Sequence, residues 1–435
     1  NESAVPSWYC NEWYTIMTTL AGLTKFCGIR FSGGSGGPSA RFGNLSLGHA
    51  RLGDDSNDDS DYTDVNPYVL SINVSRGRIR ELSEFTTGSA TVVLDNQDGR
   101  FDPNNSSSPY NPNIKPGKLL RIKITDPTTG VNEPIFEGNI SQWDVTYSWP
   151  NMSRCTIRAH DALKPLSQNS VSLTTSAAET GTVIREILQD ADWTNYELDT
   201  GDSTLAALAF DNENALKALQ LATNSEGITA KIYADKENQV LFKNRQSIYT
   251  DSNSNTSQAT FGSSGNLSFE QIDIDYDDEL VRNKVSINRT GGTAQTATDS
   301  TSIAAYNEKS YVRSNLMITS DAESLNYAQA VLSEFKDPAV RCKSMTFSPL
   351  KHTDMITQSL ARDITDRITV EFDPPGSGTT FSKQLIIGGI SHTIMPEAWQ
   401  TTFQFSSSDA SSLTWFQLGA ISGTNDQLGT GTFGY

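Results

Sequence analysis

The stretch LDNQDGRFDPNN, residues 94–105, places three carboxylates around Gly99, namely Asp95, Asp98 and Asp102. Two kinds of chemistry fit such a run: a calcium loop, or a carboxylate pair for glycoside hydrolysis. A calcium loop with Gly99 as its pivot needs an acidic first ligand and a closing Glu, whereas Leu94 and Asn105 occupy those positions. Nothing else in the sequence supports a hydrolytic pair. We therefore predict a strand that ends in a sharp turn, in which Asp95 and Asp98 bond loop amides and Gly99 has a positive φ.

The other residue types that do chemistry lack the required spacing. The four histidines lie in no HExxH pattern; they are His49, His160, His352 and His392. GTGTFG at 429–434 matches a dinucleotide fingerprint, but only Tyr435 follows it where a helix is required. The segment GGSGGPSA lacks the Lys and Ser/Thr of a phosphate loop. The sequence thus predicts no catalytic residue.

Metal binding is not expected either. The acidic loop GDDSNDDSD lacks a glycine pivot and a closing Glu, and we interpret its carboxylates as solvated; they are Asp54, Asp55, Asp58, Asp59 and Asp61. The four cysteines contain no CxxC pair, although a bridge between the first two is conceivable; they are Cys10, Cys27, Cys155 and Cys342. We predict no metal, no cofactor and no disulfide framework.

Composition sets the class of protein. The chain has 435 residues, enough for two to four domains, with only 36% hydrophobic and 19% charged residues. Abundant Ser, Thr, Asn and Gly suit short strands with many turns. The net charge of −18 argues against a protein that grips nucleic acid, although DNA can pass such a surface without sticking. We expect no membrane span, no secretory signal and a reducing compartment.

Periodicity divides the chain into five parts. Residues 1–64 are an N-terminal arm with an acidic loop, and residues 409–435 are an irregular tail. Alternating patterns predict strands in 65–166 and in 263–408, the latter with one helix, AESLNYAQAVLSEF, stopped by Pro338. Between them, 167–262 predicts two helices and a hairpin. The expected fold is mainly β with a smaller α/β module.

Details of the α/β module follow from local signals. The segment TGTVIREILQDADW has apolar residues three and four apart, as in a helix with one buried face. Asn212 or Asn214 is expected to cap the second helix, and Gly227 follows its end. The next stretch, ITAKIYADKENQVLFKNR, predicts a hairpin that turns at residues 236–238.

The long stretch SRGRIRELSEFTTGSATVVLDNQDGRFDPNNSSSPYNPNIKPGKLLRI resembles the opening domain of the minor tail proteins of long-tailed bacteriophages. In that family an RGR segment, a small-residue strand and an LDN-DGRFDP turn precede a Pro-rich loop and a further strand. Residues 179–193 with 214–245 resemble the family's helix-hairpin domain. Residues 322–350 and 386–406 resemble its later helix-and-strand unit and closing strands.

The resemblance implies a tail-tip or baseplate hub, similar in fold to the hubs of contractile tails. Such a hub holds two tail-tube-like β-barrel domains per chain and forms a homotrimer, so that six similar barrels dock on a six-fold tube. The implied partners are the tail tube or distal tail protein, the tape measure protein, and tail fibre or receptor-binding proteins, with DNA only in transit. The implied location is the virion tail tip, after assembly in the host bacterial cytoplasm.

Two other functions remain open at this stage. A carbohydrate-binding or adhesin-like protein is favoured by the polar β composition, with three tryptophans available to stack on sugars: Trp143, Trp149 and Trp399. A hydrolase has no supporting motif, and only the α/β module could house one. The N-terminal SWYCNEWYTIM has no counterpart in the family pattern, and we interpret it as an arm that packs on a neighbouring subunit.

Overall fold

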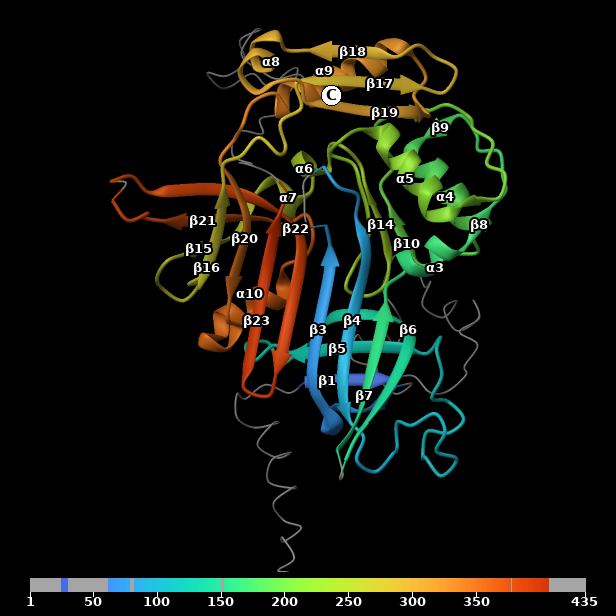
Figure 1. Cartoon of the computed structure of the whole chain (residues 1–435), viewed down its shortest axis with the longest axis vertical. Coiled ribbons are helices and arrows are strands. Elements are labelled where there is room, and N and C mark those ends of the chain that lie inside the picture. The colour runs from blue at the N-terminus through green and yellow to red at the C-terminus, as the bar shows by residue number, and fades with distance from the viewer. Residues whose placement is uncertain (1–24, 30–61, 79–81, 150–151, 377, 407–435) are drawn as a thin grey trace, which may run out of the picture.

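A thirteen-stranded sheet dominates the computed structural model of the chain, which describes residues 25–29, 62–78, 82–149, 152–376 and 378–406. Most of its strands run lengthwise through the molecule, and smaller α/β elements lie at one end (Figure 1). The fold is therefore mainly β, with a smaller α/β module, as the sequence predicts. None of the described helices is long and apolar enough to cross a membrane.

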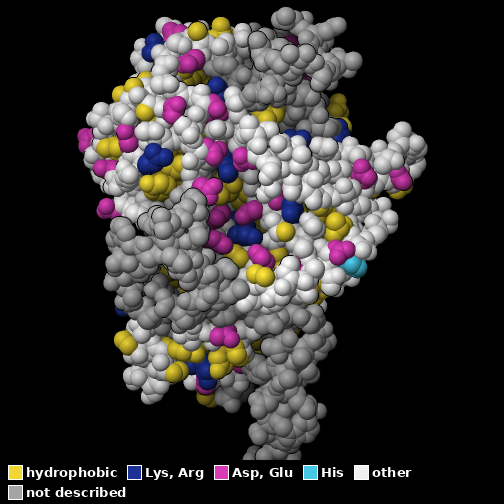
Figure 2. Space-filling model, turned by 180° about the vertical axis from the view of Figure 1, so that it is seen from behind, with side chains coloured by type: hydrophobic (Ala, Val, Ile, Leu, Met, Phe, Trp, Pro, Cys, Tyr) yellow, Lys and Arg dark blue, Asp and Glu magenta, His cyan; other side chains and the backbone are white. Residues whose placement is uncertain are grey.

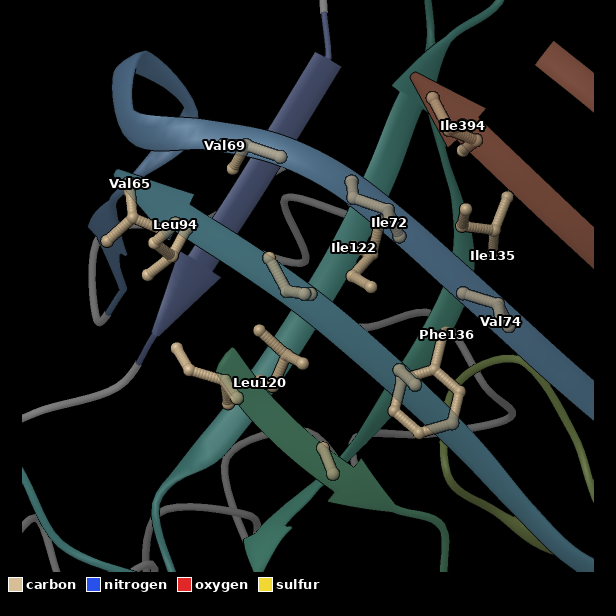
Figure 3. Packing of buried hydrophobic residues seen from close by; sticks show 14 of the residues in the cluster. Val65, Val69, Ile72, Val74, Leu94, Leu120, Ile122, Ile135, Phe136 and Ile394 are labelled. Carbon is tan, nitrogen blue, oxygen red and sulfur yellow. The ribbon is translucent and has the colours of Figure 1, made fainter. Parts of the chain in front are cut away.

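The first unit contains five strands that pair in the order β3-β4-β7-β6-β5. They are β3 (Val69–Gly77), β4 (Thr86–Asp95), β5 (Leu119–Thr125), β6 (Asn132–Ser148) and β7 (Met152–His160). Alternate residues of each strand point to one face, where Ile72, Val92 and Ile157 are buried. β5 crosses the other strands, and their side chains meet in one apolar core (Figures 1 and 3).

Part of the N-terminal region extends this unit. β1 (Lys25–Ile29) pairs antiparallel with β5, and β2 (Thr63–Asp64) pairs with β1. A short 3₁₀ helix, η1 (Asn66–Tyr68), leads into β3. Residues 25–29 of the N-terminal region thus add a strand to the sheet of their own chain. Backbone hydrogen bonding decides this, and the sequence around residue 25 shows no alternation that would predict it. The aromatic residues before β1 lie outside the described residues.

The second unit repeats the order, as β16-β20-β23-β22-β21. Its strands are β16 (Gln271–Asp275), β20 (Arg341–Phe347), β21 (Arg367–Phe372), β22 (Phe381–Met395) and β23 (Ala398–Phe405). An extra strand, β15 (Ser257–Gly262), pairs parallel with β21. β20 and β21 are joined by η2 (Pro349–Lys351) and α10 (Thr353–Ala361). Taken in chain order, strands β3 to β7 therefore correspond to β16, β20, β21, β22 and β23.

The two units share one continuous sheet. β22 pairs antiparallel with β3 over Gly389–Ile394 and Ile72–Gly77, and we call this pairing the seam. The close approach explains two glycine motifs, RGR and IGGI. A Cβ on Gly77 would lie 2.4 Å from the carbonyl oxygen of Gly388, and Gly77 has a φ of +97°. Any side chain there would push the strands apart.

A separate module is inserted between β16 and β20. It consists of β17 (Lys284–Arg289), β18 (Gln295–Thr298), α8 (Ser300–Tyr306), β19 (Ser310–Leu316) and α9 (Asp321–Phe335). α9 is the predicted helix and packs Tyr327, Val331 and Phe335 against the three strands. The prediction of one helix in 263–408 is wrong, because α8 and α10 also lie there. Both are short and begin at polar caps, Asp299 and His352, so their apolar periodicity spans too few residues to stand out.

The middle module lies between the two units in sequence. Its helices are α3 (Leu163–Gln168), α4 (Thr180–Asp190), α5 (Ala215–Glu226), α6 (Ser247–Thr250) and α7 (Ser252–Asn255). Its strands are β8 (Ser170–Val171), β9 (Ala178–Glu179), β10 (Tyr196–Leu198), β11 (Thr204–Leu205), β12 (Glu213–Asn214), β13 (Lys231–Ala234) and β14 (Val240–Lys243). The side chain of Asn214, not Asn212, caps α5, and Gly227 ends it, as predicted. The β13–β14 hairpin is confirmed, with Asn238 at φ +63°.

Candidate functional site: the open face of the large sheet

The stretch that raised the question of chemistry is a turn, as predicted. The Asp95 and Asp98 carboxylates accept hydrogen bonds from the amides of Gln97 and Arg100, at 3.1 Å each, and Gly99 has a φ of +71°. The buried Phe101 anchors the loop in the core between Tyr68 and Tyr110. The carboxylates thus organise backbone and pair with Arg100, whose guanidinium lowers the pKa of Asp98.

The loop continues as a staircase of turns. Amides at three-residue intervals donate to the carbonyl three residues earlier, from Gly99 to Asn111. Short polar side chains support the steps: Asp102, Asn105 and Ser108 each accept from the amide two residues on, at 2.8 to 3.1 Å. This geometry explains why the segment is rich in Asn, Asp and Ser, since these side chains mimic backbone in turns.

The opposite face of the sheet carries a continuous polar surface, which the sequence analysis missed. Directly paired residues in an antiparallel sheet lie on the same face, so the register defines rows that cross the strands. One row crosses seven strands, from β16 to β7: Gln271, Thr346, Thr402, Ser391, Ser75, Ser89 and His160. A second row crosses six strands, from β23 to β6: Gln400, Thr393, Asn73, Thr91, Arg158 and Gln142.

This open face is close to neutral. Its residues are exposed or half-exposed, and several bond one another, as do Thr346 and Thr402 at 2.9 Å. Burial and the nearby Lys164 lower the pKa of His160, so the first row is uncharged at neutral pH. Arg158 is the charged member of the second row. On the molecular face seen in Figure 2, by contrast, acidic side chains are interspersed with basic and uncharged ones.

The signal for this face was present in the sequence. Strand segments such as SATVVLD and QTTFQF alternate a buried apolar residue with Ser, Thr or Gln. Alternation alone identifies half-buried strands, but it does not say that the polar positions of both units lie in common rows. That alignment depends on the seam.

A buried ionic junction holds the two units and the middle module together. The Nη2 atom of Arg76, on β3, lies 3.0 Å from Oδ1 of Asp363, which follows α10. The buried Asp161, just after β7, accepts hydrogen bonds from the amides of Gly88 and Leu163, at 2.7 and 3.0 Å. These contacts join strands that are far apart in the chain.

The hairpin of the middle module reaches into the same junction. Lys236 donates from Nζ to the carbonyl oxygen of Leu360 at 3.1 Å and lies 3.8 Å from the Glu133 carboxylate. Burial raises the pKa of Asp161 and of Asp235 to about 7, and that of Asp366 to about 6. Desolvation is the largest cause at each residue, so the junction favours protonated carboxyl groups.

His392 is a packing residue rather than a base. It lies inside β22 and is buried. Its Nδ1 lies 3.0 Å from the Thr401 hydroxyl and accepts from the indole N–H of Trp399 at 3.4 Å. Burial, and then the charge of Arg76, lowers the pKa of His392 to about 3. The ring therefore stays neutral and acts as a hydrogen-bonding part of the core.

The other predicted candidates are dispersed. Cys155 and Cys342 are buried free thiols, and His352 caps α10. Of the tryptophans, Trp399 is in the core, Trp143 is half-buried, and Trp149 is 95% exposed at the tip of the β6–β7 hairpin. Among the described residues, no group of three or more His, Cys, Asp or Glu is placed to hold a metal ion.

Several sequence candidates lie outside the described residues. They are Cys10, His49, the acidic loop with Asp54, Asp55, Asp58, Asp59 and Asp61, the segment GGSGGPSA and the GTGTFG match at 429–434. Cys27 lies on β1, whereas Cys10 lies outside the described residues, so the structure does not test a bridge between them.

Comparison with known proteins identifies the fold. No protein-family model matches the chain, and no curated protein matches it. Among solved structures, the chain is similar to the 43 kDa tail protein of prophage MuSo2 from Shewanella oneidensis, with a TM-score of 0.54 and 11% identity over 81% of this chain and 95% of that one. It is also similar to a tail protein from Neisseria meningitidis MC58, with a TM-score of 0.54 and 13% identity over 88% of this chain and 96% of that one. The chain thus has the fold of phage tail proteins, which confirms at that level the resemblance that its motifs indicate.

Proposed function

We propose that the chain is a structural component of a phage virion tail tip. In this role it forms a hub ring that closes the end of the tail tube, connects the tube to distal receptor-binding parts and provides a channel for DNA ejection. The observation that carries the proposal is the internal duplication, in which two five-strand units of the same order lie side by side in one sheet.

Duplication answers a problem of symmetry. Three chains with two similar units each present six similar units, so a homotrimer can sit on a six-fold tube without a mismatch at the contact. The eight lengthwise strands from β16 to β6 are neighbours in one sheet in each chain, and three copies would supply twenty-four strands around an axis. The continuity of pairing across the seam supports this arrangement, because it shows that one unit's edge fits the other's.

The neutral open face is suited to line the channel. A surface that lets DNA pass must avoid ion pairs with phosphates, since Lys and Arg contacts to the backbone dominate nucleic-acid affinity. The first row holds Ser, Thr, Gln and the neutral His160, and Arg158 is the one charged residue of the second row, so the two rows offer a single such contact. The polar side chains of the rows would hydrogen-bond to water in the channel, and they would bind the DNA only weakly.

The remaining partners follow from the same proposal. The ring would contact the tail tube or distal tail protein on one side, with the tape measure protein in or near its opening, and tail fibre or receptor-binding proteins beyond it. The protein would assemble in the host bacterial cytoplasm and remain in the virion tail. No catalytic turnover is part of the proposal.

The test is the shape and mass of the purified protein. A mass of three times 47.5 kDa by light scattering, and rings with a central hole in negative-stain images, are expected. A monomer at all accessible concentrations, without rings, would overturn the ring. The exposed Trp149 favours carbohydrate binding as the second candidate, and glycan binding by that monomer, lost in Trp149→Ala, would establish it.

A further inference from the structure

The seam provides a template for the contact between copies of the chain. Within one chain, β22 of the second unit pairs with β3 of the first. The equivalents of these strands in the other unit, β6 and β16, have no such neighbour over Gln142–Ser148 and Gln271–Asp275 in the described part of the sheet. The inference below rests on the proposed ring and specifies the residues that close it.

Matching β6 to β22 requires no superposition, because both strands carry the same irregularity. The register with the following strand shifts between Ile140 and Gln142 in β6, and between Ile387 and Gly389 in β22. Counting onward from Gln142 and Gly389, Tyr147 corresponds to Ile394. Both strands then end one residue later, at Ser148 and Met395.

Matching β16 to β3 uses the chain of pairings across each unit. In the first unit, Ile72 pairs with Val92, which pairs with Ile157. In the second unit, the corresponding row runs from Ile272 through Met345 to Phe403. Arg158 and Gln404 occupy equivalent places beside the two shifts, so Ile157 corresponds to Phe403 and Ile272 corresponds to Ile72.

We propose that the end of β6 pairs antiparallel with β16 of a second copy, in the register of the seam. Because Ile394 pairs with Ile72 at the seam, Tyr147 would lie opposite Ile272 of the neighbouring copy. Because Thr393 pairs with Asn73, Thr146 would lie opposite Asp273 of that copy. The strands on the two sides of this contact run antiparallel, as they do throughout the sheet. Each copy contributes the end of β6 to one neighbour and β16 to the other.

The surface chemistry of the two edges supports this occupant. At the seam, Ile72 and Ile394 are each 2% exposed, whereas Tyr147 is 65% exposed. The β16 edge also exposes apolar side chains, with Ile274 at 43% and Tyr276 at 67%. Exposed apolar edge strands pair readily with strands of other chains. Because β6 and β16 are complementary in this way, we expect them to pair between copies of the chain. Thr146 would also bring a hydroxyl donor to the Asp273 carboxylate.

Disulfide trapping tests the register directly. Directly opposite residues of antiparallel strands have Cα atoms about 4.5–5.5 Å apart, within the range that a disulfide spans. We expect the double variant Tyr147→Cys/Ile272→Cys to give covalent dimers and trimers, and no larger species, on non-reducing gels after mild oxidation. The matched control is Tyr147→Cys/Asp275→Cys, whose cysteines would be too far apart in this register. The parent and the single variants give the background of the native thiols.

The outcomes separate the register from the ring. Trimers by light scattering with cross-linking in the control and not in the Ile272 pair would overturn the register and leave the ring intact. Covalent ladders beyond the trimer would overturn closure by three copies. A monomer at every concentration, with no cross-link in either variant, would overturn both this contact and the proposed function.

Discussion

The two five-strand units have the same strand order but different interiors. The first packs mainly Ile, Val and Leu, whereas the second is centred on aromatic residues, with Phe403 at 5.1 Å from Phe347 and 6.0 Å from Phe261 between ring centroids. Equivalent positions thus hold Ile157 in one unit and Phe403 in the other, both fully buried. The comparison teaches that strand order and face alternation define the unit, and that its core can be filled in more than one way.

The units differ also in what their loops carry. Between the first two strands, the first unit has a short loop, and the second has the inserted module of β17–β19 and two helices. Between the second and third strands, the first unit has the Asn/Asp staircase and the second has α10, whose Ile356 and Leu360 pack into the first unit's core. The connections between strands therefore differ although the strand order is shared. Through α10, the second unit completes the apolar core of the first.

The largest expected effect is at the equivalent core positions. Phe403→Ala should lower the free energy of unfolding by about 3–5 kcal/mol and Ile157→Ala by about 2–4 kcal/mol, because the larger side chain leaves the larger cavity. Urea unfolding followed by circular dichroism measures both. Equal losses would mean that the aromatic core collapses around the gap, and would contradict the cavity argument.

The second prediction compares the seam with the free edge. Ile394→Ala removes a buried side chain and should cost about 2–4 kcal/mol of unfolding free energy. Tyr147→Ala, at the equivalent but exposed place, should change it by less than about 0.5 kcal/mol in dilute protein. The same Tyr147 variant should reduce the trimer fraction measured by light scattering. If Tyr147→Ala destabilised the dilute protein as much as Ile394→Ala, the edge would not be free.

The third prediction concerns pH at the ionic junction. A buried carboxyl group with a raised pKa favours its protonated form, so its contribution to stability is present at low pH and is lost as pH rises through about 7. His392, with its pKa lowered to about 3, acts oppositely: its contribution is present above the ordinary histidine pKa and is lost as pH falls. Between pH 8 and 5.5, the stability gained as Asp161, Asp235 and Asp366 become protonated exceeds the stability lost through His392. Acidification over this range should therefore raise the free energy of unfolding.

Asp235→Asn isolates one of these groups. The Oδ1 atom that accepts from the amides of Glu237 and Gln239, at 2.9 and 2.8 Å, is kept in the amide. The advantage of the variant over the parent should grow by about 2 kcal/mol between pH 5.5 and pH 8, because only the parent's carboxyl group titrates in the folded state over this range. Thermal melts across this range test the sign. A constant difference at both pH values would mean that the Asp235 carboxyl group does not titrate between them.

The last prediction concerns the loop of turns that begins at Gly99. Gly99 has a positive φ, and a Cβ there would lie 3.3 Å from Nδ2 of Asn105. Gly99→Ala should therefore cost about 1 kcal/mol, and Gly99→Asn less, because Asn tolerates the left-handed region. Thermal melting of the two variants side by side measures the difference. An unchanged melting temperature for Gly99→Ala would show that the turn adopts another backbone without cost.

Local signals predicted a large part of the molecule. Alternation identified the strands of the first unit, the Asp-rich turn was interpreted correctly, and Asn214 and Gly227 marked the limits of α5. The same local reasoning missed α8 and α10, which are too short for their periodicity to show, and it missed β1, which is defined only by its partner β5. It also gave no sign that the His392 ring is enclosed by residues brought from β3 and β23.

What the sequence determined by itself is therefore the broad class of the fold: mainly β, with turns built by Asn, Asp and Gly and with a helical middle module. Only the tertiary structure decided that β3 meets β22 and so aligns the polar residues of both units into common rows. Register is a relation between strands more than 300 residues apart in the chain, and backbone pairing and the close contact of Gly77 with Gly388 fix it. Periodicity within one strand carries no record of which strand lies beside it.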